Sequence, residues 1–352
     1  MTNLRIADFG VRVGRMEPGN LNRITDVPGV RVGHATIADA RHRTGVTLIL
    51  PCEDNPFTRK LVAACHVQNG FGKTCGLVQV EELGELETPI ALTNTLNVGL
   101  VADAIVTLTA RRCREEGVPV RSVNPVVGET NDSRLNEILD RPVGLQQVKE
   151  ALESADVRFP EGDVGAGTGT VCHGLKGGIG SASRVMRIAG TEYTLGVLVQ
   201  SNHGVLEELR LCGRPIGREI LEARREEARQ QEPDQGSVMV VLATDLPVDS
   251  RQLRRILRRC AAGLSRCGSY FGHGSGDVFL GFSTANRIAA GTAMDGLRDI
   301  QVLTEHTLER AFLAAAEATE EAVLNSLVAA SRAVARDGTV YDSLADWLRR
   351  LG

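Results

Sequence analysis

The chain has 352 residues, of which 42% are hydrophobic and 24% charged, so it can bury a full core as one large domain or about two ordinary ones. Aromatic residues make up only 3%, while glycines number 38, a balance that favours tightly packed layers over an aromatic-lined groove. The formal net charge of -4 argues against nucleic acid as a partner.

Neither a targeting segment nor a metal site is expected. The first 19 residues lack the apolar core of a signal peptide, and no apolar run approaches the roughly 20 residues of a membrane helix. The eight cysteines form no C-x-x-C pair, and the seven histidines form no H-x-x-x-H pair. We therefore expect a cytoplasmic protein with mostly buried, reduced cysteines and with neither metal nor cofactor.

The first half of the chain alternates short β-branched runs with turns. Residues 24–37 and 44–51 are predicted strands. Residues 95–113 carry apolar side chains at helical spacing and precede Gly117, which predicts a helix, and 132–140 is a shorter helix or turn.

A glycine-rich segment, 165–185, holds seven glycines within residues 165–180 and precedes a predicted strand, 194–204, that runs into a polar loop. A dinucleotide-binding G-x-G-x-x-G is disfavoured because Thr170 replaces the third glycine and the preceding "RFPEGDV" is not a buried strand. The glycines instead indicate that the backbone closely approaches another layer or a substrate.

The second half contains two predicted helices and a strand. Residues 249–268 form an amphipathic helix, 276–286 a strand, and 304–338 a long Ala-rich helix. The apolar face of the first helix is formed by four residues: Leu253, Ile256, Leu257 and Leu264. Thr304 and Thr307 are candidate N-caps of the long helix, and Gly338 is its predicted stop.

The dipeptide Gly236-Ser237 separates a polar linker, 214–235, from a buried strand at 238–242. One interpretation is an ordinary turn. The other is that the bond is cut, because a chain-terminal serine carries its own base, an α-amine of pKa roughly 7.7–8.0. The G-x-S-x-G of α/β-hydrolases does not occur around Ser275, since positions 273 and 277 are not glycine.

A series of motifs in fixed order supports the interpretation that the Gly236–Ser237 bond is cut. They are "NLNRITDVPGVRVGHATI", "TGVTLILP", "TPIALTNTLNVG", "NPVVGETND", "GTGTVCHGLKGGIGSASR", "VQSNHG", "GSVMVVLATDLP" and "GSGDVFLGFSTAN". From about residue 6 to residue 335 the chain closely resembles the L-aminopeptidase/D-esterase family, the DmpA-like group that includes β-peptidyl aminopeptidases.

The resemblance implies a four-layer α/β/β/α sandwich, similar to N-terminal-nucleophile hydrolases but with different connectivity. It also implies a single domain, 1–352, that cleaves itself between Gly236 and Ser237 into fragments 1–236 and 237–352. Family members are usually tetramers of the αβ pair, so we expect a homo-oligomer.

The same resemblance assigns the catalytic residues. Ser237 matches the nucleophile, and Asn202 matches the amide that holds the oxyanion, although a loop asparagine capping local backbone is the alternative. Ser275 and Asp277 match the pair that orients the terminal amine and hydroxyl, or else they form a glycine turn before a strand. Asp277 stands where characterised β-peptidyl enzymes carry Glu, which shortens its reach.

Three further residues are candidates for substrate binding. Glu129 matches the carboxylate that pairs with the substrate ammonium, a charge that is costly to bury alone; the alternative is a surface glutamate. Asn131 departs from the family, where an aromatic side chain is expected, so rate or substrate preference should differ. Asn94 is a candidate pocket-wall residue or a helix N-cap, a role that Thr95 or Asn97 would serve equally.

The expected function is a self-processing aminopeptidase, amidase or esterase acting through an acyl-enzyme on Ser237. An ornithine-acetyltransferase-like acyl transferase is an alternative, disfavoured because the nucleophile is serine and no A-T-M-L junction occurs. An uncut scaffold without catalysis is the other. The preference for α-, β- or D-residues is set by pocket shape and stays open.

Overall fold

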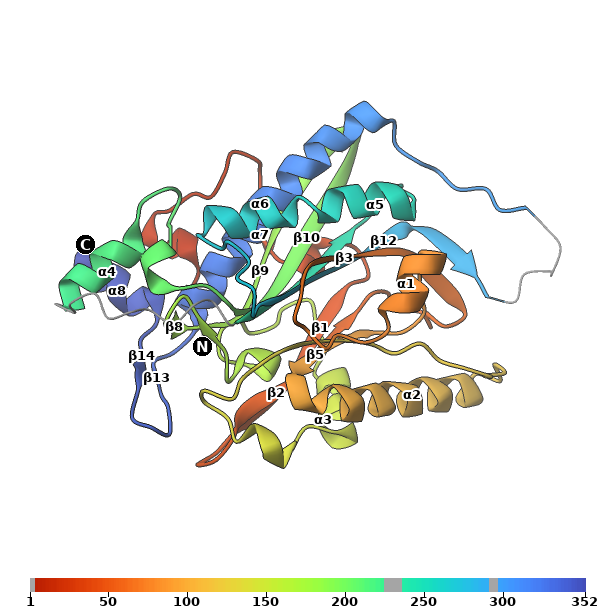
Figure 1. Ribbon diagram of the computed structural model, residues 1–352. Coiled ribbons are helices and arrows are strands. Elements are labelled where there is room, and N and C mark those ends of the chain that lie inside the picture. The colour runs from red at the N-terminus through yellow and green to blue at the C-terminus, as the bar shows by residue number, and fades with distance from the viewer. Residues whose placement is uncertain (1–3, 225–235, 291–296) are drawn as a thin grey trace.

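The computed structural model describes residues 4–224, 236–290 and 297–352. These residues form four layers, with two β-sheets packed face to face and helices on the outer face of each (Figure 1). The predicted α/β/β/α sandwich is therefore confirmed.

The larger sheet has six strands, and Ser237 is the first residue of one of its two middle strands. In spatial order the strands are β4 (Glu85–Leu86), β3 (Arg59–Gly70), β12 (Gly276–Ala289), β11 (Ser237–Thr244), β10 (Thr191–Asn202) and β9 (Gly178–Ile188). Strand β11 pairs antiparallel with β10 and parallel with β12.

The smaller sheet has four strands: β1 (Arg31–Ala38), β2 (Arg43–Leu50), β5 (Ile90–Asn94) and β6 (Val126–Thr130). Two short hairpins lie outside both sheets: β7 (Val171–Cys172) with β8 (Leu175–Lys176), and β13 (Ala333–Val334) with β14 (Val340–Tyr341).

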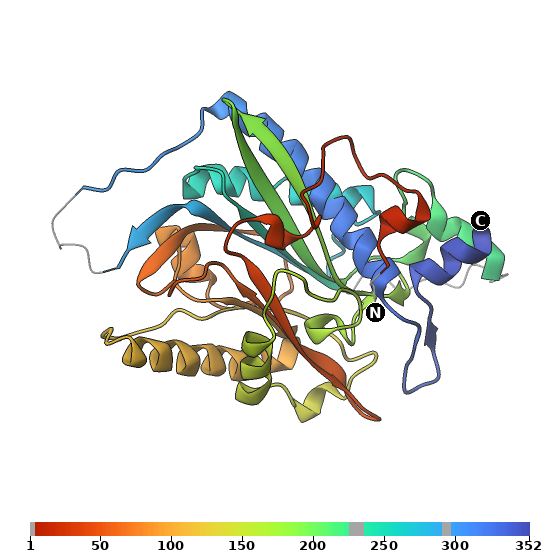
Figure 2. The ribbon, with the colours of Figure 1, turned by 180° about the vertical axis from the view of Figure 1, so that it is seen from behind.

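Helices cover the outer faces of both sheets. On the larger sheet lie α5 (Ser250–Leu257), α6 (Cys260–Arg266) and α7 (Leu308–Ala329), and Figure 2 shows α7 running along β9 and β10. On the smaller sheet lie α2 (Val98–Glu115) and α3 (Leu145–Glu153). The remaining α-helices are α1 (Leu77–Leu83), α4 (Ile216–Arg224) and α8 (Leu344–Leu351). Short 3₁₀ turns lie at Ile6–Phe9, Ile24–Asp26, Thr95–Asn97, Ile138–Asp140, Gly165–Gly167, Leu206–Glu208 and Glu305–Thr307.

Alternate residues of β11 enter two different cores. Val238, Val240 and Leu242 pack in the cluster beneath α7, whereas Met239 and Val241 pack in the cluster between the sheets. Side chains of a strand alternate between its faces, and a strand covered on both faces needs apolar residues at every position. This explains the unbroken apolar run after Ser237.

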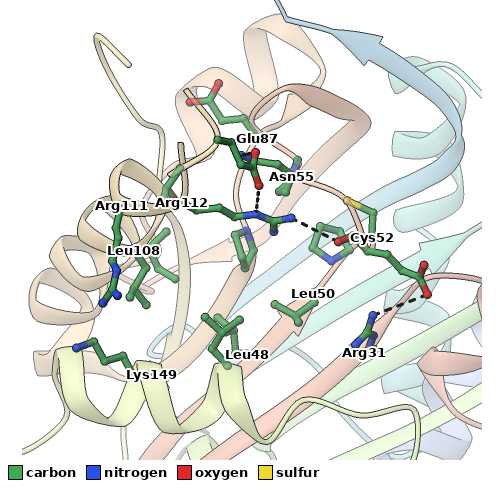
Figure 3. Close-up of a pocket in the computed structure, with 18 of the residues that line it drawn as sticks. Arg31, Leu48, Leu50, Cys52, Asn55, Glu87, Leu108, Arg111, Arg112 and Lys149 are labelled. Atoms are coloured by element: carbon green, nitrogen blue, oxygen red, sulfur yellow. Dashed lines mark hydrogen bonds and ion pairs between the residues drawn. The ribbon is translucent and has the colours of Figure 1, made fainter. Parts of the chain in front are cut away.

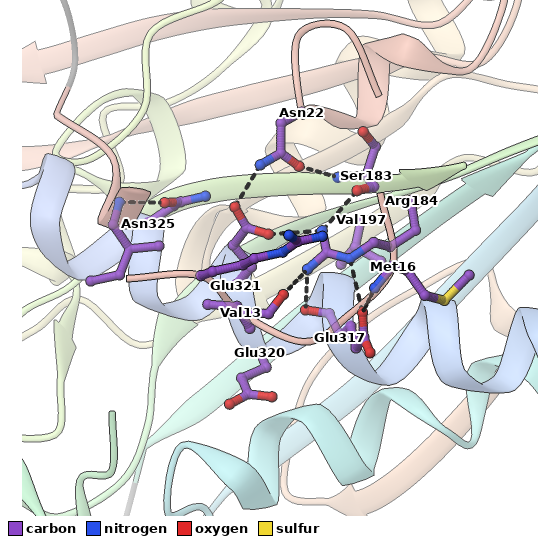
Figure 4. Close-up of polar contacts among 12 residues, drawn as sticks. Val13, Met16, Asn22, Ser183, Arg184, Val197, Glu317, Glu320, Glu321 and Asn325 are labelled. Atoms are coloured by element: carbon purple, nitrogen blue, oxygen red, sulfur yellow. Dashed lines mark hydrogen bonds and ion pairs between the residues drawn. The ribbon is translucent and has the colours of Figure 1, made fainter. Parts of the chain in front are cut away.

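A buried ionic cluster ties α7 to β9 and to the N-terminal segment (Figure 4). The Arg184 guanidinium is only 1% exposed and lies 3.2 Å from Glu317 and 2.7 Å from Glu321. It also donates to the Val13 carbonyl at 2.8 Å. Because each charge is paired and hydrogen-bonded, the cluster can stay buried between the layers.

Two predicted helices differ in the structure. The long helix stops at Ala329 instead of 338, because the chain turns away to form the β13–β14 hairpin, and Gly338, with φ of 85°, lies in the turn of that hairpin. The helix predicted over 249–268 divides into α5 and α6, although its four predicted core residues are all buried. Of the two possibilities for 132–140, a short helix or a turn, the turn is found, with a 3₁₀ turn at Ile138–Asp140.

The predicted polar linker is partly helical. Its first half forms α4, because Ile216 and Ile220, four residues apart, are both buried. The rest, 225–235, lies outside the described residues.

All eight cysteines are free thiols, and five of them are buried. Across the three described ranges, we find no helix with the length and apolar character needed to cross a bilayer.

Candidate active site

Ser237 is the first residue of β11, at one end of the larger sheet. It pairs with Asn202, the last residue of β10, on one side and with Gly276, the first residue of β12, on the other. Both Ser237 and Asn202 are buried. Three separate predicted motifs therefore meet where β11 begins.

The position before Ser237 accepts only glycine. A Cβ atom on Gly236 would lie 2.0 Å from the Asn202 carbonyl oxygen and 2.6 Å from the His203 Cα, both backbone atoms that cannot swing away. The Gly236 carbonyl accepts a hydrogen bond from the Gly276 N–H at 3.2 Å. The carbonyl of the bond predicted to be cut is thus already bound to a backbone donor.

The Asn202 side chain is fixed by two backbone groups from distant segments. Its Nδ2 donates to the Asn131 carbonyl at 3.0 Å, and its Oδ1 accepts from the Val171 N–H at 2.9 Å. These partners are 71 and 31 residues away, so Asn202 does not cap local backbone. A side-chain amide carries two N–H groups, and the one that does not bind Asn131 is the donor a developing oxyanion would need.

Ser275 and Asp277 form a buried pair on either side of Gly276. The Ser275 Oγ lies 2.8 Å from Asp277 Oδ1 and donates to it. The turn before this pair is held by Asn69, whose Nδ2 donates to the carbonyls of Gly272 and Ser275. The pair is therefore placed directly beside the residue that pairs with Ser237.

Glu129 lies near the end of β6 and is only 2% exposed, so it is not a surface glutamate. Its Oε1 accepts from the Lys73 N–H at 2.7 Å, and its Oε2 accepts from the Thr95 Oγ1. A Cβ built on Gly72 would contact both Glu129 Oε1, at 3.4 Å, and the Gly276 Cα, at 3.6 Å. One glycine thus separates the carboxylate from the strand that borders Ser237.

The other two predicted binding residues have structural contacts. The Asn131 side chain is exposed and accepts from the Ser133 N–H at 3.0 Å, while its carbonyl receives the Asn202 amide. Asn94 is buried and serves as the N-cap of the Thr95–Asn97 turn, accepting from two backbone N–H groups. Its Nδ2 donates to the Thr44 Oγ1 at 2.8 Å, so the helix-cap alternative describes its contacts.

Comparison with known proteins identifies the family. The profile of "Peptidase family S58" matches residues 22–341, nearly the whole chain. The chain belongs to this family. A curated relative, the β-peptidyl aminopeptidase BapA of Sphingosinicella xenopeptidilytica, is 39% identical across 99% of this chain and 90% of that protein.

Solved structures agree with the family assignment. A β-aminopeptidase from a Burkholderia species superposes with a TM-score of 0.89 at 40% identity, covering 99% of both chains. The L-aminopeptidase D-Ala-esterase/amidase of Ochrobactrum anthropi, described as a variant of the Ntn hydrolase fold, gives 0.89 at 35% identity over 99% of both chains. This S58 chain is accordingly a hydrolase of the aminopeptidase type.

In this S58 peptidase, sequence patterns assigned no role to two buried polar residues, Lys176 and Gln200. Lys176, on β8, is 1% exposed and donates to the carbonyls of Gly167 and Gly177 at 2.9 and 2.7 Å. Burial lowers the pKa of Lys176 to about 8.

Gln200 donates to the Thr93 and Ala166 carbonyls and so joins the two sheets. Thr95 was predicted only as a possible helix cap, but its hydroxyl binds Glu129. The only sequence signal for Lys176 and Gln200 was their position directly before the "GG" and "SN" of two quoted motifs.

A large cavity of about 720 Å³ lies elsewhere, on the side of the smaller sheet covered by α2 and α3 (Figure 3). Leu48, Leu50 and Leu108 line its apolar part, and Arg111 and Lys149 stand at its edge. It shares no lining residue with the Ser237 site. The cavity is therefore not the substrate pocket of the Ser237 chemistry.

Proposed function

We propose that this S58 peptidase cuts its own Gly236–Ser237 bond and then uses Ser237 to release N-terminal residues from small peptides, amides or esters. The observation that carries the proposal is the position of Ser237, which starts the central strand between Asn202 and Gly276. Cleavage there would place a new N-terminus on a rigid, buried strand.

Self-cleavage begins with attack of the Ser237 Oγ on the Gly236 carbonyl carbon. The negative charge that develops on the Gly236 oxygen is met by the Gly276 N–H, which already binds that oxygen. Breaking the C–N bond moves the acyl group from nitrogen to oxygen, and water then hydrolyses the ester. The products are a carboxylate on Gly236 and a free α-amine on Ser237.

Turnover repeats this chemistry on a bound substrate. The α-amine takes the proton from the Ser237 Oγ as it attacks the substrate carbonyl, and the Ser275–Asp277 pair orients the amine and hydroxyl. The second N–H of the Asn202 amide stabilises the oxyanion. The leaving amine or alcohol departs, and water releases the acyl group from Ser237.

Glu129 supplies the aminopeptidase specificity in this proposal. A buried carboxylate beside Gly276 can pair with a substrate ammonium, which would otherwise be costly to bury. Asn131 lies beside Asn202 and leaves an exposed amide where relatives are expected to carry an aromatic ring, so substrate preference should differ from theirs.

The wider proposal covers fragments, assembly and location. We infer fragments 1–236 and 237–352, a homo-oligomer of αβ pairs, tetrameric by family resemblance, and a cytoplasmic location. The relatives named above are aminopeptidases and none is an acyltransferase, and the nucleophile is a serine rather than the threonine of an ornithine-acetyltransferase-like enzyme.

Denaturing electrophoresis with N-terminal sequencing tests this proposal. Purified protein should give two bands, one of which begins Ser237-Val-Met-Val, and Ser237→Ala should give one uncut chain without activity on p-nitroanilides. Ser265→Ala, which removes an exposed hydroxyl on α6, should still be cut. A single band in the wild type would leave the uncut scaffold, and a β fragment that starts elsewhere would refute the cleavage site.

A further inference from the structure

Cys172, His173 and His203 form a buried cluster beside the active site. Cys172 ends β7 and His173 follows it, whereas His203 comes directly after Asn202 at the end of β10. The His173 N–H donates to the His203 carbonyl at 2.7 Å, which holds the two segments together. All three side chains are buried, but Val171, Gly174 and Gly204 next to them are partly exposed, so the cluster lies just below the surface.

The side chains of the cluster converge on one point. One potential ligand atom from each residue lies within 4.8 Å of the other two, and the Cys172 Sγ is 3.9 Å from the His203 Nδ1. In a tetrahedral zinc site, bonds of about 2.3 Å to sulfur and 2.0–2.1 Å to nitrogen place neighbouring ligand atoms about 3.3–3.6 Å apart. Small side-chain rotations would bring the three atoms to that spacing.

His173 is held in the manner of a metal ligand. Its Nδ1 lies 3.0 Å from the Val205 carbonyl, which can only accept, so Nδ1 carries the proton and Nε2 carries the lone pair. Metal-binding histidines typically donate their other ring N–H to a carbonyl or carboxylate in this way. His173 also adopts φ of 48°, a left-handed conformation that non-glycine residues seldom hold without a local constraint.

We propose that Cys172, His173 and His203 bind one Zn²⁺-class ion through a thiolate and two imidazoles. This donor set suits zinc and other borderline or soft ions, whereas Mg²⁺ and Ca²⁺ prefer oxygen. The site is distinct from the chemistry on Ser237, which needs no metal. The spacing rules did not find this site because His203 lies 31 residues after Cys172, on a segment that only the fold brings beside Cys172 and His173.

The site adjoins the peptidase machinery through His203. That residue follows Asn202, and its Cα, together with the Asn202 carbonyl, prevents a side chain at position 236. An ion bound to His203 would therefore restrain the end of β10 that carries the oxyanion donor.

Cobalt titration of the full-length protein tests the site. After EDTA treatment and dialysis, Co²⁺ should bind one ion per chain and produce a thiolate-to-cobalt charge-transfer band, and Zn²⁺ should displace it. Cys172→Ala should abolish the band, and His203→Gln should weaken binding at least tenfold. Cys260→Ala, another buried cysteine, and His34→Gln, on β1, should leave binding unchanged.

X-ray absorption of the zinc-loaded wild type gives a test that does not depend on variants folding. The expected ligand shell contains one sulfur and two histidine nitrogens. A shell without sulfur, substoichiometric binding, or unchanged cobalt affinity in Cys172→Ala would each overturn the proposal. Self-cleavage at Ser237 can be scored separately on the same samples, so failure of the metal site is distinguishable from failure of the proposed peptidase.

Discussion

At the residue scale, the proposed oxyanion role of Asn202 predicts different effects on self-cleavage and on turnover. The Gly236 carbonyl already accepts the Gly276 N–H, and the nucleophile is joined to that carbonyl covalently. Such proximity can supply about 7–11 kcal/mol of a barrier. A free substrate lacks this covalent connection, so under the proposed mechanism it depends more on electrostatic stabilisation by Asn202.

Asn202→Ala should consequently lower kcat by roughly 10²–10³ while changing KM little, because the donor acts on charge that appears only in the transition state. Two bands should still form after long incubation. Steady-state kinetics on a p-nitroanilide, beside timed gels, measure both effects. Asn286→Ala, which removes an amide bound to the Val248 carbonyl at the other end of β12, serves as the control. Near-normal turnover in Asn202→Ala would contradict the oxyanion role and leave Asn202 with only its structural contacts to Val171 and Asn131.

Glu129 should govern the choice between free and blocked amino termini. In Glu129→Gln the carboxylate charge is lost, and a substrate ammonium would be buried without its partner, a penalty of about 3–5 kcal/mol in buried pairs. We expect kcat/KM for a free-amine substrate to fall by roughly 10² or more, with self-cleavage retained. An N-acetylated substrate should be slow with the wild type. Equal wild-type rates on blocked and free substrates would contradict both the role of Glu129 and exopeptidase action.

At the element scale, the glycine-rich segment is held by a buried lysine. Lys176 donates to carbonyls of Gly167 and Gly177, and close packing explains the neighbouring glycines: a Cβ on Gly180 would lie 2.0 Å from the Ala322 carbonyl of α7. The approach to another layer, one of the two possibilities that the glycines indicated, is therefore present. The buried ammonium makes this element sensitive to pH.

Stability should rise with pH above about 8 because of Lys176. Burial lowers its pKa from 10.5 to about 8 in the folded protein, so between these values the unfolded chain binds one more proton than the native chain. The free energy of unfolding should increase by about 1.4 kcal/mol per pH unit in this window, and the gain is lost progressively as pH falls from 10.5 to about 8. Urea unfolding of the uncut Ser237→Ala chain, with and without Lys176→Met, measures the difference. A difference that stays constant from pH 8 to 10.5 would contradict the shift.

At the scale of the whole molecule, cleavage would divide a shared core rather than separate two domains. Strand β11 belongs to fragment 237–352 but pairs with β10 of fragment 1–236 from Ser237–Asn202 to Thr244–Leu195. The ion pairs of Arg184 with Glu317 and Glu321 also join the two fragments. Neither fragment can bury its apolar surface without the other.

The two fragments should therefore stay associated after cleavage until the fold itself is lost. They should co-elute in gel filtration under native conditions and separate only in denaturant, with dissociation and loss of secondary structure sharing one midpoint. Ser237→Ala provides the uncut reference. Separation of the fragments in native buffer would contradict the interlocked sheet.

Local sequence was enough to predict much of this protein. The apolar run after Ser237, the alternation in the first strands and the helical spacing in α2 are encoded within a few residues, because side-chain periodicity follows backbone geometry. The order of the motifs then indicated the family, the layered fold and the residues Ser237, Asn202 and Glu129.

Only the tertiary structure decided which distant groups meet. Asn202 contacts Asn131 and Val171, and Cys172 lies beside His203, because strand register and layer packing bring these segments together. The end of α7 at Ala329 was likewise unpredictable, since an Ala-rich run favours helix beyond that residue and the hairpin that replaces it forms between β13 and β14. Periodicity within a segment is a local property, whereas the partner of a buried polar group is determined by the whole fold.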